Sequence, residues 1–332
     1  MKKIIFFLYY LKETEVKKFT SYLDFASLQT GTSKVTLLLD VVRSVFRYDI
    51  SLLDYFYFRF YEKNSTQRAE WAGTGYMYRF QLRMNPKVSR AVLAQKLLFL
   101  EAYKDFVKHP FASIDDVLRL NANSKAVLQN SSGKVVFKDS TGQCGYGIII
   151  REVSSMHSED IVHYMRKHKF DMLEAFVVQH DELMKLSPSG LNTIRVFSQL
   201  DANDEVVILG CRLRITINSH VDNMASGNMA APIDEKTGIV TGPGVFSDIR
   251  KESCAFHPVT TIPIVGFQIP YWEATMSMVY KAAKLDVRNR SIGWDIAITN
   301  DGPELIEGNH NWCKLLWQLP VQKGMKSVLE TF

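Results

Sequence analysis

The sequence predicts an α+β protein with antiparallel sheets, preceded by a helix-rich N-terminal lobe. Residues 1 to about 110 carry apolar side chains at helical spacing, whereas from Lys134 the chain turns to short β-branched runs. Strands and helices then follow one another without the regular alternation that builds a doubly wound parallel sheet. Antiparallel sheets with helices packed against them are therefore the expected architecture.

The N-terminal lobe is predicted from two long helical patterns. The segments VTLLLDVVRSVFRYDI and VSRAVLAQKLLFLEAYKDFVKHP repeat apolar residues at helical intervals, and Pro110 ends the second. Neither segment shows the strict alternation of a half-buried strand.

The extreme N-terminus, MKKIIFFLYYLKETE, contains an apolar run that is too short to span a bilayer. A buried first helix or strand is expected there. Peripheral membrane contact through Phe6, Phe7, Tyr9 and Tyr10 is the alternative.

The rest of the chain is divided into recognisable elements. KVVFKDS and GYGIIIREV predict a hairpin, SEDIVHYMRKHKF predicts a helix capped by Ser158, and LEAFVVQ predicts a strand. Two further strands are expected in NTIRVFSQLD and EVVILGCRLRI. A helix from about Ile269 to Leu285 then precedes a final hairpin, GWDIAITNDGPELIEGN.

Composition limits the class of protein. The 332 residues are 46% hydrophobic and 23% charged, as in globular proteins, and the four cysteines form no C-x-x-C pair. We therefore expect a reducing compartment, the cytoplasm. The net charge of +5 is spread along the chain, which argues against nucleic acid as a partner and suits small anionic substrates.

A lysine followed by a glycine-bearing loop is the first candidate for binding chemistry. Lys138 ends a predicted strand, and the loop that follows contains Ser140, Gly142, Gly145 and Gly147. Backbone N–H groups and an ammonium in such a loop can cradle phosphates, although a plain turn is the simpler interpretation. The glycines match neither the P-loop nor the dinucleotide-binding order.

The final hairpin is the candidate metal site. A three-residue loop ending at Gly302 would place Asp295 opposite Glu307, and Asn309 would share their face. Three hard oxygen ligands would then converge, as Mg²⁺ requires. A two-residue loop formed by Asp301 and Gly302 would instead put the two carboxylates on opposite faces.

Taken in order, these motifs resemble an ATP-grasp enzyme, and more closely the sugar-transfer-associated ATP-grasp family of bacterial surface-polysaccharide pathways. QHDELMKLSPSGLNTIRV, VDNMASGNMAAPID and IGWDIAITNDGPELIEGNHNW carry the closer likeness, which covers roughly residues 70 to 320. The resemblance implies two α+β lobes with antiparallel sheets that sandwich ATP. It also implies three parts, namely a helical lobe at 1–110, a small lobe at 111–180 and a large lobe at 181–332.

The resemblance also implies roles for single residues. Lys138 and Lys96 would contact the phosphates, Glu174 would face the adenine amino group, and Phe176 with Val177 would line the base. Asp181, seven residues after Glu174, matches the family's ribose-binding acid, and the neighbouring Glu182 is the alternative for this role.

Further roles concern the transferred phosphoryl group. Arg195 would stabilise it, although a cross-strand salt bridge is the alternative, and Arg212 with Arg214 are second candidates for holding a carboxylate or a sugar phosphate. The loop around Asn223 would close over the nucleotide, with a plain surface loop as the alternative. His180 and His310 lie in motif-like stretches and are candidates for ligand contact.

The implied function is an ATP- and Mg²⁺-dependent ligase that joins a carboxylate to an amine through an acyl phosphate. One partner would be a sugar, a sugar nucleotide or a lipid-linked glycan. Two alternatives stay open: a kinase on the same scaffold that phosphorylates a sugar hydroxyl, and a non-catalytic glycan-binding assembly subunit.

Overall fold

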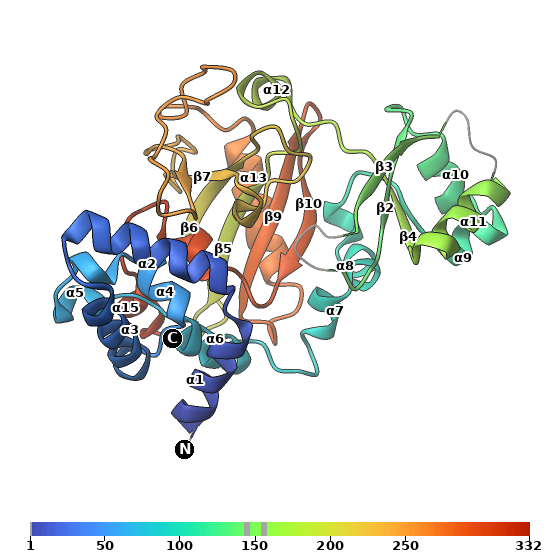
Figure 1. Ribbon diagram of the computed structural model, residues 1–332. Coiled ribbons are helices and arrows are strands. Elements are labelled where there is room, and N and C mark those ends of the chain that lie inside the picture. The colour runs from blue at the N-terminus through green and yellow to red at the C-terminus, as the bar shows by residue number, and fades with distance from the viewer. Residues whose placement is uncertain (1, 143–146, 154–157) are drawn as a thin grey trace.

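The computed structural model describes residues 2–142, 147–153 and 158–332. It has three visible parts: a cluster of N-terminal helices, a large sheet at the centre, and a small sheet that projects to one side (Figure 1). Every strand pairing in both sheets is antiparallel, as the sequence predicts.

The chain begins with helices, several of which start at a side-chain cap. Ser33 and Ser51 accept hydrogen bonds from backbone N–H groups in the first turns of α3 and α4, which satisfies donors that lack a partner inside the helix. The helical elements are α1 (Lys2–Glu13), α2 (Val16–Thr30), α3 (Lys34–Tyr48), α4 (Leu52–Tyr57), η1 (Phe60–Glu62), α5 (Ser65–Ala69), α6 (Thr74–Met84), α7 (Ala91–Ala94), α8 (Lys96–Ala102) and η2 (Lys104–Phe106).

The small sheet has the strand order β1-β4-β2-β3 and contains the predicted hairpin of β2 and β3. Its buried side chains, among them Phe137 and Leu173, form a core of their own with the helices α9, α10 and α11. The bounds are β1 (Phe111–Ser113), α9 (Ile114–Arg119), α10 (Ala122–Leu128), β2 (Lys134–Lys138), β3 (Ile149–Glu152), α11 (Ser158–His168) and β4 (Met172–Ala175).

The large sheet has the order β10-β9-β5-β6-β7-β8. Its elements are α12 (Asp181–Leu186), β5 (Ile194–Leu200), β6 (Val206–Ile215), η3 (Met224–Ser226), β7 (Met229–Ile233), β8 (Val245–Phe246), α13 (Trp272–Ala283), β9 (Ser291–Thr299), β10 (Gly302–Asn309), α14 (Lys314–Gln318) and α15 (Lys326–Leu329). Alternation along β5 turns Ile194 and Val196 toward the core that contains α13, and turns Arg195 and Phe197 to the other face.

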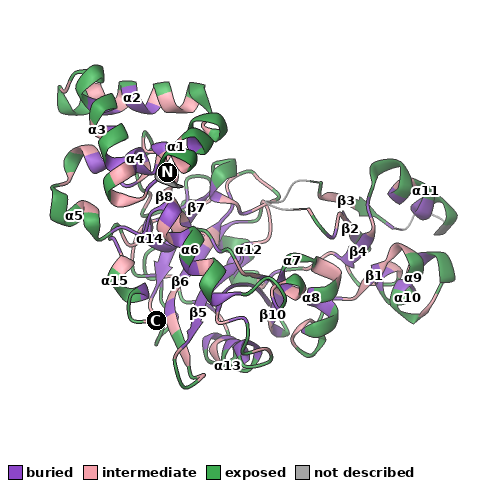
Figure 2. Cartoon of the chain, turned by 90° about the horizontal axis from the view of Figure 1, so that it is seen from below, coloured by how far each residue is buried: buried purple, intermediate pink, exposed green. Residues whose placement is uncertain are grey.

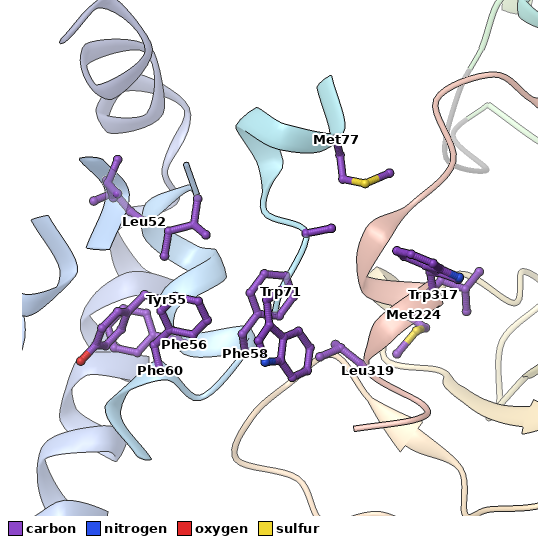
Figure 3. Close-up of a cluster of buried hydrophobic side chains, with 14 of the residues drawn as sticks. Leu52, Tyr55, Phe56, Phe58, Phe60, Trp71, Met77, Met224, Trp317 and Leu319 are labelled. Carbon is purple, nitrogen blue, oxygen red and sulfur yellow. The ribbon is translucent and has the colours of Figure 1, made fainter. Parts of the chain in front are cut away.

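The N-terminal helices cover part of that other face. They share one hydrophobic core with Phe197 and with the segment that follows β10. In Figure 3 the stacked rings of Phe58 and Trp71, whose centroids are 4.5 Å apart, lie toward Trp317. The Trp317 indole N–H donates to the Leu209 carbonyl at 2.8 Å, which fixes α14 against β6. The helical lobe is thus packed beside the residues on the Arg195 face.

The final hairpin pairs as predicted at the acids but not at its turn. Thr299 pairs with Gly302 rather than Pro303, so the loop contains two residues, 300 and 301. That register alone would place Asp295 opposite Ile306. A β-bulge between Leu305 and Glu307 shifts the register by one residue and restores the pair of Asp295 and Glu307. The predicted loop length is therefore wrong, whereas the predicted carboxylate pair is present.

No helix in the described ranges is long and apolar enough to cross a bilayer. Gly145, one of the predicted phosphate-loop glycines, lies outside the described residues.

Gly293 is a position where the fold requires a glycine. A Cβ there would lie 2.6 Å from the Trp312 Cβ and 3.3 Å from the Arg195 Cδ. We predict that Gly293→Ala lowers the free energy of unfolding by about 1–3 kcal/mol, because the Trp312 backbone must shift to relieve the overlap. Urea denaturation measures this.

The matched control for Gly293 is Gly31→Asn. Gly31 has φ +67°, and a Cβ there would meet nothing within 4 Å. Asparagine tolerates this left-handed conformation, so the control should change stability by less than about 1 kcal/mol. Equal losses in both variants would contradict the packing explanation.

Candidate active site

A buried cluster of two arginines and one carboxylate lies at the centre of the large sheet. The pairing of β5 with β9 places Arg195 directly opposite Asp295, and the Arg195 Nη2 donates to the Asp295 Oδ2 at 2.7 Å. The Arg214 Nη1 donates to the same oxygen at 2.9 Å, and its Nη2 lies 2.6 Å from Asp222. Burial favours the neutral carboxyl, but the two guanidinium groups hold the pKa of Asp295 well below its usual range.

Glu307 and Asn309 extend this cluster along β10. The Asn309 Nδ2 donates to the Glu307 Oε1 at 3.1 Å and lies 3.5 Å from the Asp295 Oδ2. Burial, and then the adjacent Asp295 carboxylate, raise the pKa of Glu307 to about 7. The repulsion expected between the two acids is thus relieved in two ways: arginines neutralise Asp295, and Glu307 retains its proton up to near-neutral pH.

The side-chain oxygens of Asp295, Glu307 and Asn309 fit a magnesium ion whose other ligands would be phosphate oxygens and water. Among the described residues no three His, Cys, Asp or Glu side chains gather as a complete metal cage. Mg²⁺ is commonly held by one or two carboxylates together with phosphate oxygens and water, so two acids and an amide are sufficient. Because arginines already occupy Asp295, Glu307 is the carboxylate better able to exchange its proton for a metal ion.

The small sheet contributes Lys138 and Glu174, which form an ion pair. β2 and β4 are neighbours, and both side chains are largely buried. Burial raises the pKa of Glu174, but Lys138 and then His109 outweigh it and lower this pKa to about 2.

His109 and Glu304 are site residues that the sequence analysis missed. The His109 Nδ1 lies 2.7 Å from the Glu304 Oε2, and its Nε2 lies 3.6 Å from Glu174. Burial lowers the pKa of His109, yet the two glutamates raise it to about 9. His109 is therefore a charged link between β4 of the small sheet and β10 of the large sheet. No local motif could reveal it, since Glu304 is 195 residues away in the chain.

Lys96 lies between the two groups of charges. Its Nζ donates to the Asp139 carbonyl at 2.9 Å and to the Gly142 carbonyl. Burial lowers the pKa of Lys96, while the field of Glu307, followed by that of Glu174, opposes this shift. Lys96 thus holds the loop after β2 near the carboxylates of the large sheet.

The described part of the predicted phosphate loop is tied to the small sheet. Ser140 donates its backbone N–H to the Asp171 carboxylate at 2.7 Å, and its hydroxyl donates to the same group. Gly147 has φ +74° and open space where a Cβ would lie. Gly142 donates its backbone N–H to the Asp139 carbonyl at 3.1 Å.

The predicted adenine-binding segment follows β4. The Phe176 N–H donates to the Lys134 carbonyl at 3.1 Å, and Val177 is half-buried. Asp181 begins α12 at an exposed position, and its carboxylate lies 3.2 Å from the Asn300 amide of the β9–β10 turn. This segment therefore connects the small sheet to the tip of the last hairpin.

Arg212 and Asn223 occupy different surroundings. Arg212 is buried and donates to the Trp317 carbonyl at the C-terminal end of α14, where a cation interacts favourably with the helix dipole. Asn223 caps η3 by accepting from the Ala225 N–H at 3.0 Å. The contacts of Arg212 tie α14 to β6, and those of Asn223 shape its own loop.

The two candidate histidines, His180 and His310, lie at the start of α12 and directly after β10. His180 caps α12 by accepting from the Glu182 N–H at 3.1 Å, and its ring meets Tyr271 edge-on. His310 follows β10, and burial lowers its pKa.

The two antiparallel sheets, linked by the charged contacts of His109 with Glu174 and Glu304, are those of the ATP-grasp fold. The chain belongs to the sugar-transfer associated ATP-grasp family, whose model matches residues 76–332. The resemblance and the fold class inferred from the sequence are thereby confirmed. A search of curated proteins found no match.

Solved structures similar to this chain include the following three. One is the biotin carboxylase domain of the Hydrogenobacter thermophilus 2-oxoglutarate carboxylase, in complex with MgADP, ADP and bicarbonate (16% identity, TM-score 0.39, covering 70% of this chain and 45% of that one). Another is the ATP-grasp ligase PsnB, complexed with a phosphomimetic variant of its minimal precursor, Mg and ADP (12%, 0.42, 77% and 63%). The third is D-alanine-D-alanine ligase from Helicobacter pylori (9%, 0.43, 74% and 63%). This chain spans only about half to two thirds of their length.

The raised pKa of Glu307 predicts a pH-dependent effect of Glu307→Gln. Between the ordinary pKa of 4.5 and about 7, the unfolded chain releases this proton while the folded protein keeps it, so wild type loses stability as pH rises. At pH 5 the variant should be about as stable as wild type. At pH 8 it should gain up to about 3 kcal/mol, because each pKa unit corresponds to about 1.4 kcal/mol and the partly buried side chain retains some solvent contact.

Urea denaturation at both pH values tests this, with Glu205→Gln as the control. Glu205 is an exposed glutamate paired with Lys284, and its loss should change stability by less than about 1 kcal/mol at either pH. A Glu307→Gln effect that is the same at pH 5 and pH 8 would show that Glu307 is not held protonated.

Proposed function

We propose that the protein is an ATP- and Mg²⁺-dependent ligase that activates a carboxylate as an acyl phosphate and joins it to an amine. The observation that supports it most strongly is the buried cluster in which Asp295 is paired with Arg195 and Arg214, with Glu307 and Asn309 beside it. Lys138 of the small sheet is paired with Glu174, and Lys96 holds the loop after β2 within the field of Glu307. This pattern suits a polyphosphate with its metal ion.

The lysines provide the phosphate-binding half of the proposed site. Lys138 would exchange its ion pair with Glu174 for a nucleotide phosphate, and His109 would keep Glu174 compensated after the exchange. Lys96 would exchange the carbonyls that it now holds for phosphate oxygens. Glu174 to Val177, with Asp181, would receive the base and ribose.

The large sheet provides the catalytic half of the proposed site. Glu307, Asn309 and Asp295 would hold Mg²⁺, which when bound neutralises the charge on the phosphates. Arg195 is fixed by its bidentate contact with Asp295, so its guanidinium can meet the transferring phosphoryl group without reorganising. Arg214 would support the same charge from the other side of Asp295. Arg212 would act through the position of β6, where its contacts hold α14.

The proposed acceptor is a sugar, a sugar nucleotide or a lipid-linked glycan, with the reaction serving capsule, O-antigen or exopolysaccharide synthesis in the cytoplasm. The family's description motivates this choice. A hollow of about 370 Å³ between α2 and the loop that follows Asn223 supports it. The charged residues that line this hollow are Lys17, Lys18, Arg250 and Lys251 together with Glu15 and Asp248, so an anionic sugar would meet an excess of positive charge there.

Hydroxylamine separates the ligase from a kinase on the same scaffold. An acyl phosphate reacts with hydroxylamine to give a hydroxamate and inorganic phosphate, whereas a phosphorylated sugar hydroxyl does not. We predict that a panel of amino acids and uronic acids, incubated with enzyme, Mg²⁺-ATP and hydroxylamine, contains a carboxylate that yields a hydroxamate. ADP release without hydroxamate, on addition of a sugar alone, would favour the kinase.

A variant of Lys138 tests whether the proposed phosphate-binding residues are needed for this activity. Lys138→Ala should lower hydroxamate formation at least about a hundredfold, because it removes a charge aimed at the phosphates. Lys284→Ala, which breaks only an exposed ion pair, is the control and should keep full activity. If neither the wild type nor Lys284→Ala forms ADP or hydroxamate, and both bind a glycan, the protein is a non-catalytic subunit.

A further inference from the structure

The first helix carries an apolar surface on two sides. Phe6, Phe7 and Tyr10 pack against the core of the helical lobe. The opposite side presents Ile4, Ile5, Leu8, Tyr9 and Leu11 to solvent, with Ile5 62% and Leu8 59% exposed. Of the four aromatic residues considered from the sequence for membrane contact, only Tyr9 is exposed.

The third helix adds a second exposed apolar stripe. Val35, Leu38, Leu39 and Val42 are spaced as one face of a helix, and all four are exposed, whereas Leu37, Val41 and Val45 on the other side are buried. The exposed and buried residues of this helical region can be compared in Figure 2.

The helices that carry the two stripes lie next to each other. The ring centroid of Phe46, one turn beyond Val42 on α3, is 5.2 Å from that of Phe7, which lies on the core side of α1. The exposed residues of α1 and α3 are named here the α1–α3 apolar face. A surface of this composition exceeds the singly scattered apolar residues that are normal on a protein.

Positive charge accompanies this face. Residues 1–48 contain eight Lys and Arg residues against four Asp and Glu residues, so they account for most of the net charge of +5. Lys12, Arg43 and Arg47 are exposed on the same two helices. Two acids of this region are already paired, Asp24 with Lys34 and Asp40 with Arg68.

We infer that the α1–α3 apolar face docks on an anionic phospholipid membrane. The helices would lie in the plane of the interface, with aliphatic side chains among the acyl chains and the lysines and arginines at the phosphates. A second copy of this chain is a poorer occupant, because it would set one basic rim against another. The 12 residues of α1 could not span the bilayer, so contact would be peripheral and reversible. This inference stands apart from the proposed chemistry.

Sedimentation with vesicles tests the inference directly. The full chain should bind vesicles of phosphatidylcholine with phosphatidylglycerol, and bind pure phosphatidylcholine about tenfold more weakly. Leu8→Glu and Leu39→Glu should each weaken binding at least about tenfold, because each puts a charge into the acyl boundary. Leu285→Glu is the matched control, since Leu285 is 55% exposed on another part of the surface, and it should bind like wild type.

Thermal denaturation confirms that each variant is folded, and light scattering gives its oligomeric state without lipid. Equal vesicle binding by Leu8→Glu, Leu39→Glu and Leu285→Glu would overturn the inference. So would failure of the wild type to bind anionic vesicles. A wild-type dimer that Leu8→Glu or Leu39→Glu converts to a monomer, with vesicle binding unchanged, would assign the face to a second copy of the chain instead.

Discussion

The structure depends above all on Asp295, a carboxylate buried between two guanidinium groups in the middle of a sheet. Removing an ion pair from water is costly unless geometry and hydrogen bonding compensate it, and here Arg195 and Arg214 do so together. Asp222 in turn holds Arg214, and Gly293 leaves room for Trp312 beside Arg195. Buried ion pairs of this kind add little to the free energy of unfolding, so a functional need for charge explains the cluster better than stability does.

From this cluster, compensated charges continue through Lys96 toward the small sheet. Glu307 lies near Asp295 and within the field of Lys96, whose ammonium holds the loop that leaves Lys138. Between the two sheets, Glu174 of β4 and Glu304 of β10 enclose a protonated His109. The sites that would receive phosphates and metal are thus held ready by internal ion pairs, and ligand binding would exchange partners rather than bury new unpaired charges.

The sequence predicted the antiparallel sheets, the helical start and the strands β2, β3, β4, β5, β6, β9 and β10, because these follow from hydrophobic period and turn residues. It did not predict the short strands β1 and β8, or β7, which lies in a stretch interpreted as a loop. It could not predict the bulge after Leu305, which makes the pair of Asp295 and Glu307 compatible with a two-residue turn. Contacts across long separations were equally hidden, as in the His109 link and in the packing of Arg212 against α14. Periodicity reports which face a side chain takes, whereas the partner it meets depends on tertiary packing.

Magnesium dependence of ATP binding, measured by calorimetry, tests the central claim most directly. Wild type should bind ATP at least about tenfold more tightly with Mg²⁺ than with a chelator, because the acids of β9 and β10 would hold the ion that neutralises the phosphates. Glu307→Gln should lose most of this difference, while the exposed variant Glu205→Gln should retain it. Equal affinities for wild type with and without Mg²⁺, or a full magnesium effect in Glu307→Gln, would contradict the assignment of this carboxylate pair as the metal site.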